Sequence, residues 1–298
     1  MMNFRIIRDG ISIMQKFGLR HAFKRYRDLR LINKEDRKRS NLYDKVKPHG
    51  LVIKDILGNK MQLDMNDYGI HRDLFLDGIR EPIATKHLKN VLSEEDVVLD
   101  IGANIGYYVL IESDLCKKVY AVEPVQRNIK YLKKNIELNR KENVEVYEIA
   151  LGDVKGRKPM NISPRSNLHS FYPIDDVLKK EYIKMDTVDN FLKHKESPTF
   201  MRMDVEGYEI YILRGARKTL KKIQRVFIEI HSHIMTDEET KEVIDILKEE
   251  GFCPEKIIKY DKPGLSRILS NDYMNKIYQG DKGVYEVFWN KKHKSLKD

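Results

Sequence analysis

Short apolar runs and longer amphipathic stretches alternate along the chain from residue 97 onward. The apolar runs have the length of buried strands, and the stretches between them have apolar residues at every third or fourth position, as helices do. The expected strands are 97–101, 118–124, 144–151, 199–204 and 225–231, with 256–260 and 284–290 as further candidates. The expected helices begin near Tyr107 and at 125–139, 207–222 and 236–251. Strands that alternate with helices predict an α/β fold around a mostly parallel, doubly wound sheet.

The pattern before residue 97 and between the third and fourth strands is different. Residues 51–65 alternate between apolar and polar side chains around Gly58-Asn59, which predicts a β-hairpin. Residues 68–92 predict mainly helix. Residues 152–198 interrupt the alternation and predict short strands and an added helix.

The first 47 residues carry most of the net positive charge. They hold 14 Lys and Arg against 5 Asp and Glu, whereas the whole chain holds 56 against 46, so the remainder is nearly neutral. Apolar residues recur there at helical spacing with basic residues between them, which predicts one or two basic amphipathic helices. The apolar positions are Phe4, Ile7, Ile11, Met14, Phe23, Tyr26 and Leu29. The polar stretch 34–50, which ends in Pro48 and Gly50, is interpreted as a linker.

These features predict two parts. The first is a basic amphipathic helical extension with its linker at 1–49. The second is one α/β domain at 50–298, with a hairpin and helical lead-in at 50–96 and a core at 97–298. The pattern of the extension fits packing on the main domain, contact with an anionic membrane surface through residues 1–30, or contact with a polyanion, and it does not separate the three.

Several bulk features bear on where the protein works. No apolar run approaches the roughly 20 residues of a membrane span, and the N-terminal segment lacks the pattern of a secretory signal. Cys116 and Cys253 form no C-x-x-C pair and are expected to be buried free thiols. We therefore expect a cytoplasmic location, with membrane association through the extension as an open alternative.

The loop after the first core strand lies where a parallel sheet binds its ligand. It reads VVLDIGANIGYY and matches neither the G-x-G-x-x-G motif nor a P-loop, because Asn104 stands two residues after Gly102. Asp100 precedes this glycine, and a carboxylate there would repel a pyrophosphate. It matches instead a cationic ligand such as S-adenosylmethionine, which has a sulfonium and an ammonium group. Glu123 ends the next strand, where an acid can accept both ribose hydroxyls.

Five segments resemble, in order, the motifs of FkbM-type S-adenosylmethionine-dependent methyltransferases. They are VVLDIGANIGYY, AVEP, EIALGD, KMDTVDNFL and MRMDVEGYEIYILRGA followed by FIEIH. The resemblance covers roughly residues 75–235, and MDVEGYE is its most specific part. It implies a class I methyltransferase fold, which is Rossmann-like, with a seven-stranded mostly parallel sheet, an antiparallel last strand and helices on both faces.

The resemblance also implies which residues hold S-adenosylmethionine. The methionine-side cradle would consist of Asp100, Gly102, Ala103, Asn104 and Gly106. Glu123 would contact the ribose, Ala150 and Leu151 would contact the adenine, and Asp204 would lie beside the sulfonium. The segment GIREP has Arg80 and Glu81 where the family usually has Tyr-Glu, and Glu81 is carried over as a cofactor contact despite this departure.

Methyl transfer to a hydroxyl needs a group that removes the proton, because the pKa of the hydroxyl lies far above 7. The candidate catalytic residues follow the fourth and fifth expected strands and are Asp204, Glu206, Glu229 and His231. Glu229 and His231 are two residues apart on a strand and so point to the same face. His231 is the expected general base, because an imidazole titrates near neutral pH. A divalent cation held by Asp204, Glu229 and His231 is an alternative, although no metal is predicted, and purely structural roles are another.

We interpret the chain as an O-methyltransferase. The acceptor class, a hydroxyl of a sugar, glycolipid or related small metabolite, comes from the resemblance. The alternatives are an RNA methyltransferase that uses the basic extension as an electrostatic clamp, and a non-catalytic S-adenosylmethionine-binding protein at a membrane surface. The segment 163–173, with His169, Ser170 and Tyr172, is expected to be an ordinary surface loop, with a cover over the acceptor as the alternative. The sequence does not constrain the oligomeric state.

Overall fold

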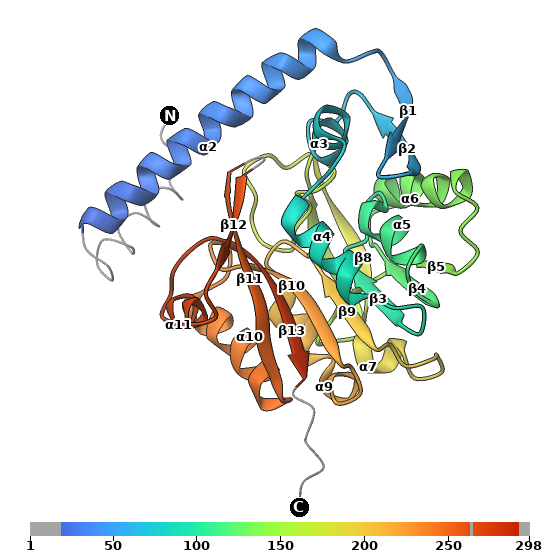
Figure 1. The fold of residues 1–298 in the computed structure, drawn as a ribbon, viewed down its shortest axis with the longest axis vertical. Coiled ribbons are helices and arrows are strands. Elements are labelled where there is room, and N and C mark those ends of the chain that lie inside the picture. Colours follow the sequence, from blue (N-terminus) through green and yellow to red (C-terminus); the bar gives the residue numbers. More distant parts are fainter. Residues whose placement is uncertain (1–18, 263–264, 292–298) are drawn as a thin grey trace, which may run out of the picture. The chain divides into compact units, whose positions relative to one another are not determined.

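The computed structural model of the chain describes residues 19–262 and 265–291. The chain divides into two compact units, residues 1–47 with 261–265 and residues 48–260 with 266–298. The first unit contains α2 (Leu19–Val46), a helix of 28 residues (Figure 1). Because α2 includes positions 23–29, part of the predicted basic helix lies within it, whereas positions 4–14 lie outside the described residues.

Most of the stretch interpreted as a linker belongs to this helix. Residues 34–46 stay helical because no proline or glycine interrupts them, and the pair Glu35–Lys38, 3.0 Å apart, lies one turn apart on the helix surface. The irregular connection therefore begins after Val46 and not at residue 34.

The second unit is built around an eight-stranded mixed sheet. In sheet order the strands are β12 (Leu265–Leu269), β11 (Phe252–Lys262), β13 (Val284–Lys291), β10 (Arg225–His231), β9 (Phe200–Met203), β3 (Val97–Ile101), β4 (Lys118–Val122) and β5 (Val144–Tyr147). The five strands from β10 to β5 are parallel. Their carboxyl ends therefore meet at one edge of the sheet, where a ligand site is expected.

The main sheet has the expected antiparallel strand, but it contains eight strands and not the expected seven. β13 runs antiparallel to both β10 and β11, as the resemblance implied. The eighth strand, β12, lies beside β11 at the edge of the sheet. Its sequence, LSRIL, is too short and too polar to stand out as a strand, so the hydrophobic pattern missed it.

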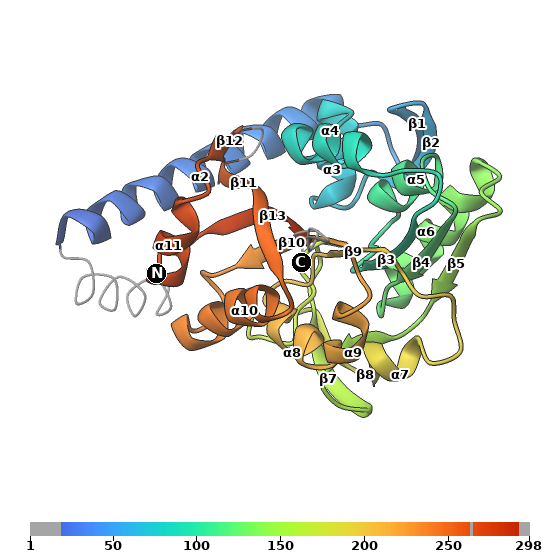
Figure 2. The same ribbon diagram turned by 60° about the horizontal axis from the view of Figure 1, so that its bottom comes forward.

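Helices cover both faces of the sheet, as expected. Figure 2 shows α4 and α5 on one face and α8, α9 and α10 on the opposite face. The helices of this unit are α3 (Ile70–Asp77), α4 (Pro82–Val91), α5 (Tyr107–Ser113), α6 (Gln126–Leu138), α7 (Val188–Phe191), α8 (Glu209–Arg214), α9 (Arg217–Leu220), α10 (Asp237–Glu249) and α11 (Tyr273–Tyr278).

The helix expected at 207–222 is divided into α8 and α9 around Gly215. A Cβ atom at Gly215 would lie 1.9 Å from the carbonyl oxygen of Gly152, so only glycine allows the two backbones to approach so closely. Spacing of apolar residues alone does not report such an approach, which is why a single helix was predicted.

Two small sheets flank the core. The hairpin of β1 (Leu51–Ile56) and β2 (Asn59–Asp64) turns at Leu57-Gly58, both with positive φ, one residue earlier than the predicted Gly58-Asn59. The insertion at 152–198 forms a three-stranded sheet in the order β6 (Ala150–Gly152), β8 (Lys179–Thr187), β7 (Gly156–Ile162), followed by α7. The short strands and the added helix expected there are confirmed.

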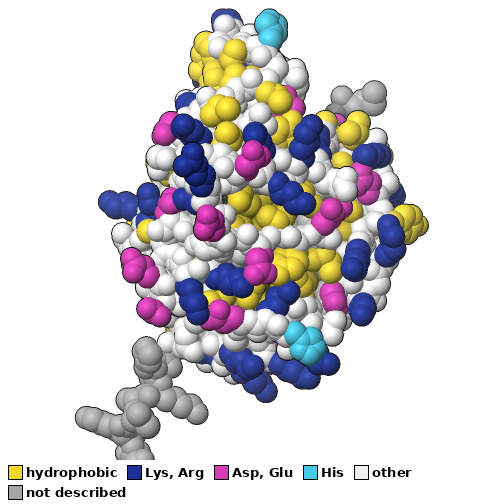
Figure 3. Space-filling view, turned by 90° about the vertical axis from the view of Figure 1, so that its right-hand side faces the viewer, with side chains coloured by type: hydrophobic (Ala, Val, Ile, Leu, Met, Phe, Trp, Pro, Cys, Tyr) yellow, Lys and Arg dark blue, Asp and Glu magenta, His cyan; other side chains and the backbone are white. Residues whose placement is uncertain are grey.

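The surface of the molecule mixes both signs of charge. On the face in Figure 3, Lys and Arg side chains are interspersed with Asp and Glu, and hydrophobic side chains form short patches between them. This mixture agrees with the near-neutral balance outside the first 47 residues. Within the described part of the chain, every helix is too short or too polar to cross a membrane.

Helix α10 begins with a reciprocal cap. The Glu239 N–H donates to the Thr236 hydroxyl at 3.1 Å, and the Thr236 N–H donates to the Glu239 carboxylate at 2.9 Å. We expect Thr236→Ala to lower the free energy of unfolding by about 1 kcal/mol, because one terminal N–H loses its partner. Urea unfolding checks this, with Thr236→Ser as the control that keeps the hydroxyl. Equal unfolding midpoints for the alanine variant and the wild type would contradict the role of the cap.

Candidate active site

A cavity lies at the carboxyl ends of β3, β4, β5 and β9. Loops that follow these strands form its walls, as the open parallel sheet requires. The residues singled out from the sequence that line it are Gly102, Ala103, Asn104, Glu123, Ala150, Leu151, Asp204 and Glu206. Arg80, Arg202, Tyr107 and Tyr108 add further polar groups to the wall.

The loop after β3 has a backbone that requires its glycines. Gly102 has a φ of +88°, and a Cβ atom there would lie 2.0 Å from the carbonyl oxygen of Asp204. Gly106, at +94°, leads directly into α5, and a Cβ atom there would meet Leu132 at 2.7 Å. Asn104 also has a positive φ, of +51°. The loop is thereby folded tightly against β9, with its backbone facing the cavity.

Asp100 does not reach the cavity, contrary to the prediction that it meets a cationic ligand. Its side chain is fully buried, and its carboxylate accepts a hydrogen bond of 2.8 Å from Arg202 on the neighbouring strand. Burial raises the pKa of Asp100, although Arg202 opposes the shift. The positive charge paired with Asp100 is thus the guanidinium of Arg202, and Arg202 itself lines the cavity.

Glu123 lies at the end of β4, as predicted, and its carboxyl is held in place by backbone groups. The N–H groups of Asn104 and Val125 each donate to it at 2.9 Å. Burial raises the pKa of Glu123 to about 7, against the effect of these hydrogen bonds. Ala150 and Leu151 form part of an apolar wall at the end of β6, on the same cavity.

Glu81 lies behind Arg80, which is the residue at the cavity wall. The Arg80 guanidinium bonds Glu81 at 2.5 Å and approaches Asp204 to 4.0 Å. The Tyr108 hydroxyl donates to the other oxygen of Glu81 at 2.7 Å. Arg80 was noticed in the sequence only as a departure from the family pattern, and that departure was the signal that could have identified it.

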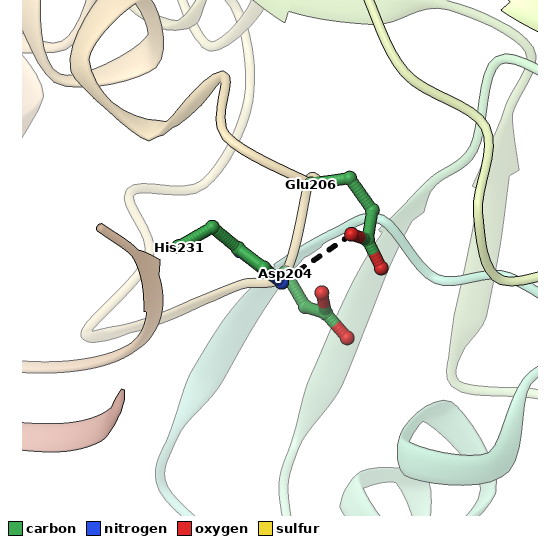
Figure 4. A group of neighbouring side chains, drawn as sticks. All are labelled: Asp204, Glu206 and His231. Carbon is green, nitrogen blue, oxygen red and sulfur yellow. Dashed lines mark ion pairs between the residues drawn. The ribbon is translucent and has the colours of Figure 1, made fainter. Parts of the chain in front are cut away.

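The four candidate catalytic residues gather at the ends of β9 and β10, but only two of them reach the cavity. Asp204 and Glu206 line it, whereas His231 is 3% exposed and lies behind them (Figure 4). His231 Nε2 is 3.5 Å from the Glu206 carboxylate and 3.8 Å from that of Glu229. Its Nδ1 is 2.7 Å from the buried Glu209, which the sequence reading did not single out.

The charges in this cluster do not favour His231 as the base. Burial would lower the pKa of His231, but the carboxylates of Glu206, Glu209 and Glu229 outweigh it and raise the pKa well above its usual value. These neighbours favour the protonated imidazole, which has no free nitrogen to accept a proton. Burial raises the pKa of Glu206 to about 7, and the nearby His231 limits that rise.

The pKa values of the other two carboxyls, Glu229 and Asp204, are shifted in opposite directions. Burial, with Asp204 nearby, raises the pKa of Glu229 well above its usual range and so favours its protonated form. Burial also acts to raise the pKa of Asp204, but Arg202 and Arg80 lower it by more, so Asp204 stays ionised. The cavity thus has one carboxylate that stays ionised, Asp204, and two carboxyls whose pKa is raised to about 7, Glu206 beside Asp204 and Glu123 at the end of β4.

The same residues could hold a divalent cation. Ligand atoms of Asp204, Glu206 and His231 all lie within 4.8 Å of one another, so the geometry offers Glu206 and not the expected Glu229 as the third ligand. Arg80 and Arg202 lie beside Asp204 and would repel an added cation.

The residues around the cavity fit S-adenosylmethionine. Buried oxygens of the Asn104 and Asn128 side chains have no hydrogen-bond partner among the described residues, although both side chains line the cavity. A ligand rich in hydroxyl and amino groups would give them partners. Glu123 lines the same cavity and has acceptor capacity for hydroxyls.

We expect Gly102→Ala to abolish binding of S-adenosylhomocysteine, because the added Cβ would displace either the loop or Asp204. Isothermal titration calorimetry measures this directly. Gly58→Ala is the matched control: its φ of +89° imposes the same backbone strain, and nothing lies within 4 Å of the added Cβ. Equal affinities for wild type and Gly102→Ala would show that this loop does not hold the cofactor.

Comparisons with known proteins agree with this geometry. A model of the methyltransferase FkbM domain matches residues 100–253, which is 154 of the 298 residues. Hexuronic acid methyltransferase AglP of Haloferax volcanii is 27% identical over 166 residues, 54% of this chain and 65% of AglP. Uncharacterized protein MJ1452 of Methanocaldococcus jannaschii is 36% identical over 78 residues, 26% of this chain and 30% of that protein. The chain thus matches less than two thirds of the length of either relative.

One solved structure aligns with part of this chain. Methyltransferase FkbM from Methylobacillus flagellatus KT aligns with a TM-score of 0.41 and 19% identity, over 65% of this chain and 44% of that one. The match to the family model covers more than half of the chain and includes the loop after β3 and the ends of β9 and β10. The chain therefore belongs to the FkbM family of S-adenosylmethionine-dependent methyltransferases.

Proposed function

We propose that the protein transfers a methyl group to a hydroxyl of a sugar, on a glycan, glycolipid or related small metabolite. The observation that carries the proposal is the Glu206 carboxyl, which lines the cavity beside Asp204 and has the buried His231 behind it. A carboxylate in this place can remove the proton of a hydroxyl. A sugar acceptor is supported by the relative AglP, which is named as a hexuronic acid methyltransferase.

S-adenosylmethionine, when bound, supplies a methyl group on a positively charged sulfur. The residues that would hold it line the cavity and are Gly102, Ala103, Asn104, Glu123, Ala150, Leu151 and Asp204. Three further residues would act indirectly. Asp100 would act by orienting Arg202, Gly106 by starting α5 close to the strand, and Glu81 by orienting Arg80.

Glu206 is the general base in this proposal, in place of His231. With a pKa near 7 it is substantially ionised at neutral pH and can still accept a proton. His231, held as a cation by Glu209, stabilises the ionised form of Glu206 from behind. Asp204 keeps its charge through Arg202 and Arg80, and it presents a carboxylate to the cavity for orienting the acceptor or the cofactor.

We expect incubation with labelled S-adenosylmethionine and a glycan and lipid extract of the source cells to give a labelled methyl ether. An ether withstands mild alkali, whereas a methyl ester releases its label as methanol, so alkali treatment distinguishes a hydroxyl acceptor from a carboxyl one. Glu206→Gln should lower the rate by about 10²-fold or more, the contribution typical of a general base. Glu148→Gln, which changes an exposed carboxylate, should leave the rate unchanged. Label that is lost in alkali would contradict the hydroxyl acceptor.

The rate of transfer should rise with pH and reach half its plateau near pH 7, because the ionised form of Glu206 is required and burial raises its pKa to about 7. His231→Gln removes the positive charge that lowers this pKa, so the midpoint should move to higher pH. Initial rates between about pH 5 and pH 9 give both midpoints. If the variant and the wild type share one midpoint, His231 does not act on Glu206.

A further inference from the structure

The segment 163–173 is not the ordinary surface loop that its sequence suggested. Ser166, Asn167, His169 and Phe171 line the cavity, and His169 is only 8% exposed. The imidazole of His169 has no role in the methyl transfer proposed above. His169 is a titratable residue buried at the wall of the cofactor cavity, and its presence there needs a physical reason.

The loop is held on both sides of His169 by other residues. The Ser166 carbonyl accepts hydrogen bonds from the side-chain amides of Asn104 at 3.2 Å and Asn128 at 3.0 Å. The Ser170 hydroxyl donates to the carbonyl of Glu206 at 2.9 Å. The backbone around His169 is therefore positioned by its neighbours, and its own side chain is free to serve a ligand.

The position of the proton on His169 follows from its contacts. The N–H of Ser163 donates to Nδ1 at 3.0 Å, so Nδ1 carries no proton. Burial lowers the pKa of His169 to about 4, so the ring is neutral near pH 7 and its proton lies on Nε2. Nε2 is buried and has no partner among the described residues. A buried donor without an acceptor destabilises the fold, and a bound ligand would supply the acceptor.

The surroundings of His169 indicate which part of the cofactor lies nearest. On one side, Asn128 contacts both the Ser166 carbonyl and the carboxylate of Glu123, the expected ribose residue. On the other side, the ring of Phe171 packs 4.5 Å from that of Tyr208, centroid to centroid. Tyr208 in turn lies against Gly152, next to the expected adenine residues Ala150 and Leu151. The residues on either side of His169 are thus linked to the expected ribose residue and to the expected adenine residues.

We propose that His169 donates a hydrogen bond from Nε2 to the adenosine part of S-adenosylmethionine. The proposal depends on the cofactor site described above and adds a specificity-determining residue to it. A neutral N–H at this place recognises an acceptor atom of a ribose hydroxyl or a purine ring nitrogen. The methionine part of the cofactor has no role in this contact.

Two variants distinguish the role of Nδ1 of His169 from that of Nε2. An asparagine amide occupies the position of Nδ1 and can accept from Ser163, so His169→Asn keeps the internal hydrogen bond and removes only the donor that faces the ligand. A glutamine amide reaches the position of Nε2, so His169→Gln restores that donor. Calorimetric titration with S-adenosylhomocysteine and with 5′-methylthioadenosine, which lacks the amino-acid part, measures affinity without any methyl acceptor.

We expect His169→Asn to weaken the binding of both ligands by about tenfold, the effect of one hydrogen bond. His169→Gln should bind both within about threefold of wild type. Unchanged affinity in His169→Asn, a loss confined to S-adenosylhomocysteine, or a glutamine variant as weak as the asparagine variant would each overturn the proposal. Wild-type protein that binds neither ligand would instead overturn the assignment of the cofactor site itself.

Discussion

The buried guanidinium of Arg202 is the interaction on which the arrangement of the active site depends. It lies opposite Asp100 in the parallel register of β3 and β9 and bonds that carboxylate at 2.8 Å. Its second nitrogen lies 3.4 Å from Asp204, and its centre is 3.9 Å from the centroid of the Tyr108 ring. A lone charge at this depth would lose its hydration without compensation, so each partner requires the other. The pair joins two core strands and keeps Asp204 ionised at the cavity wall.

Strained backbone surrounds the same cavity. Glu81, Asn104 and Glu206 have positive φ values of +48°, +51° and +52°, which cost about 1–3 kcal/mol each in residues with side chains. The conformation of Asn104 brings its N–H to the Glu123 carboxylate, and that of Glu206 accompanies the turn of its carboxyl toward the cavity. The surrounding hydrogen bonds offset this cost. Asn104 and Glu206 line the cavity, whereas Leu57 and Arg140, which also have positive φ, do not.

The proposed division of roles among the catalytic residues follows from burial. Alternation along β10 correctly places Glu229 and His231 on one face of the strand, but both lie behind the residues that follow β9. His231 is enclosed by three carboxyls, which raise its pKa and so favour the protonated imidazole over the free base. Its intrinsic pKa, the basis for selecting it from the sequence, is therefore a poor guide at this position. Glu206, three residues after β9 ends, has the exposure that the chemistry requires.

The sequence by itself determined the alternation of strands and helices in the core, the glycine loop after β3, Glu123 at the end of β4 and the family, because these depend on short-range periodicity and on contiguous motifs. It did not show that the strand expected at 144–151 is divided between two sheets, as β5 and β6. Only the tertiary structure decided that Arg202 pairs with Asp100, that Arg80 lies at the cavity wall and that the segment 163–173 covers it. Such contacts join residues distant along the chain, as when Ser166 donates to Asp67 and accepts from Asn104. Burial and pKa depend on those distant neighbours. No local pattern encodes which charges will be enclosed together, and that enclosure is what sets the chemistry of the site.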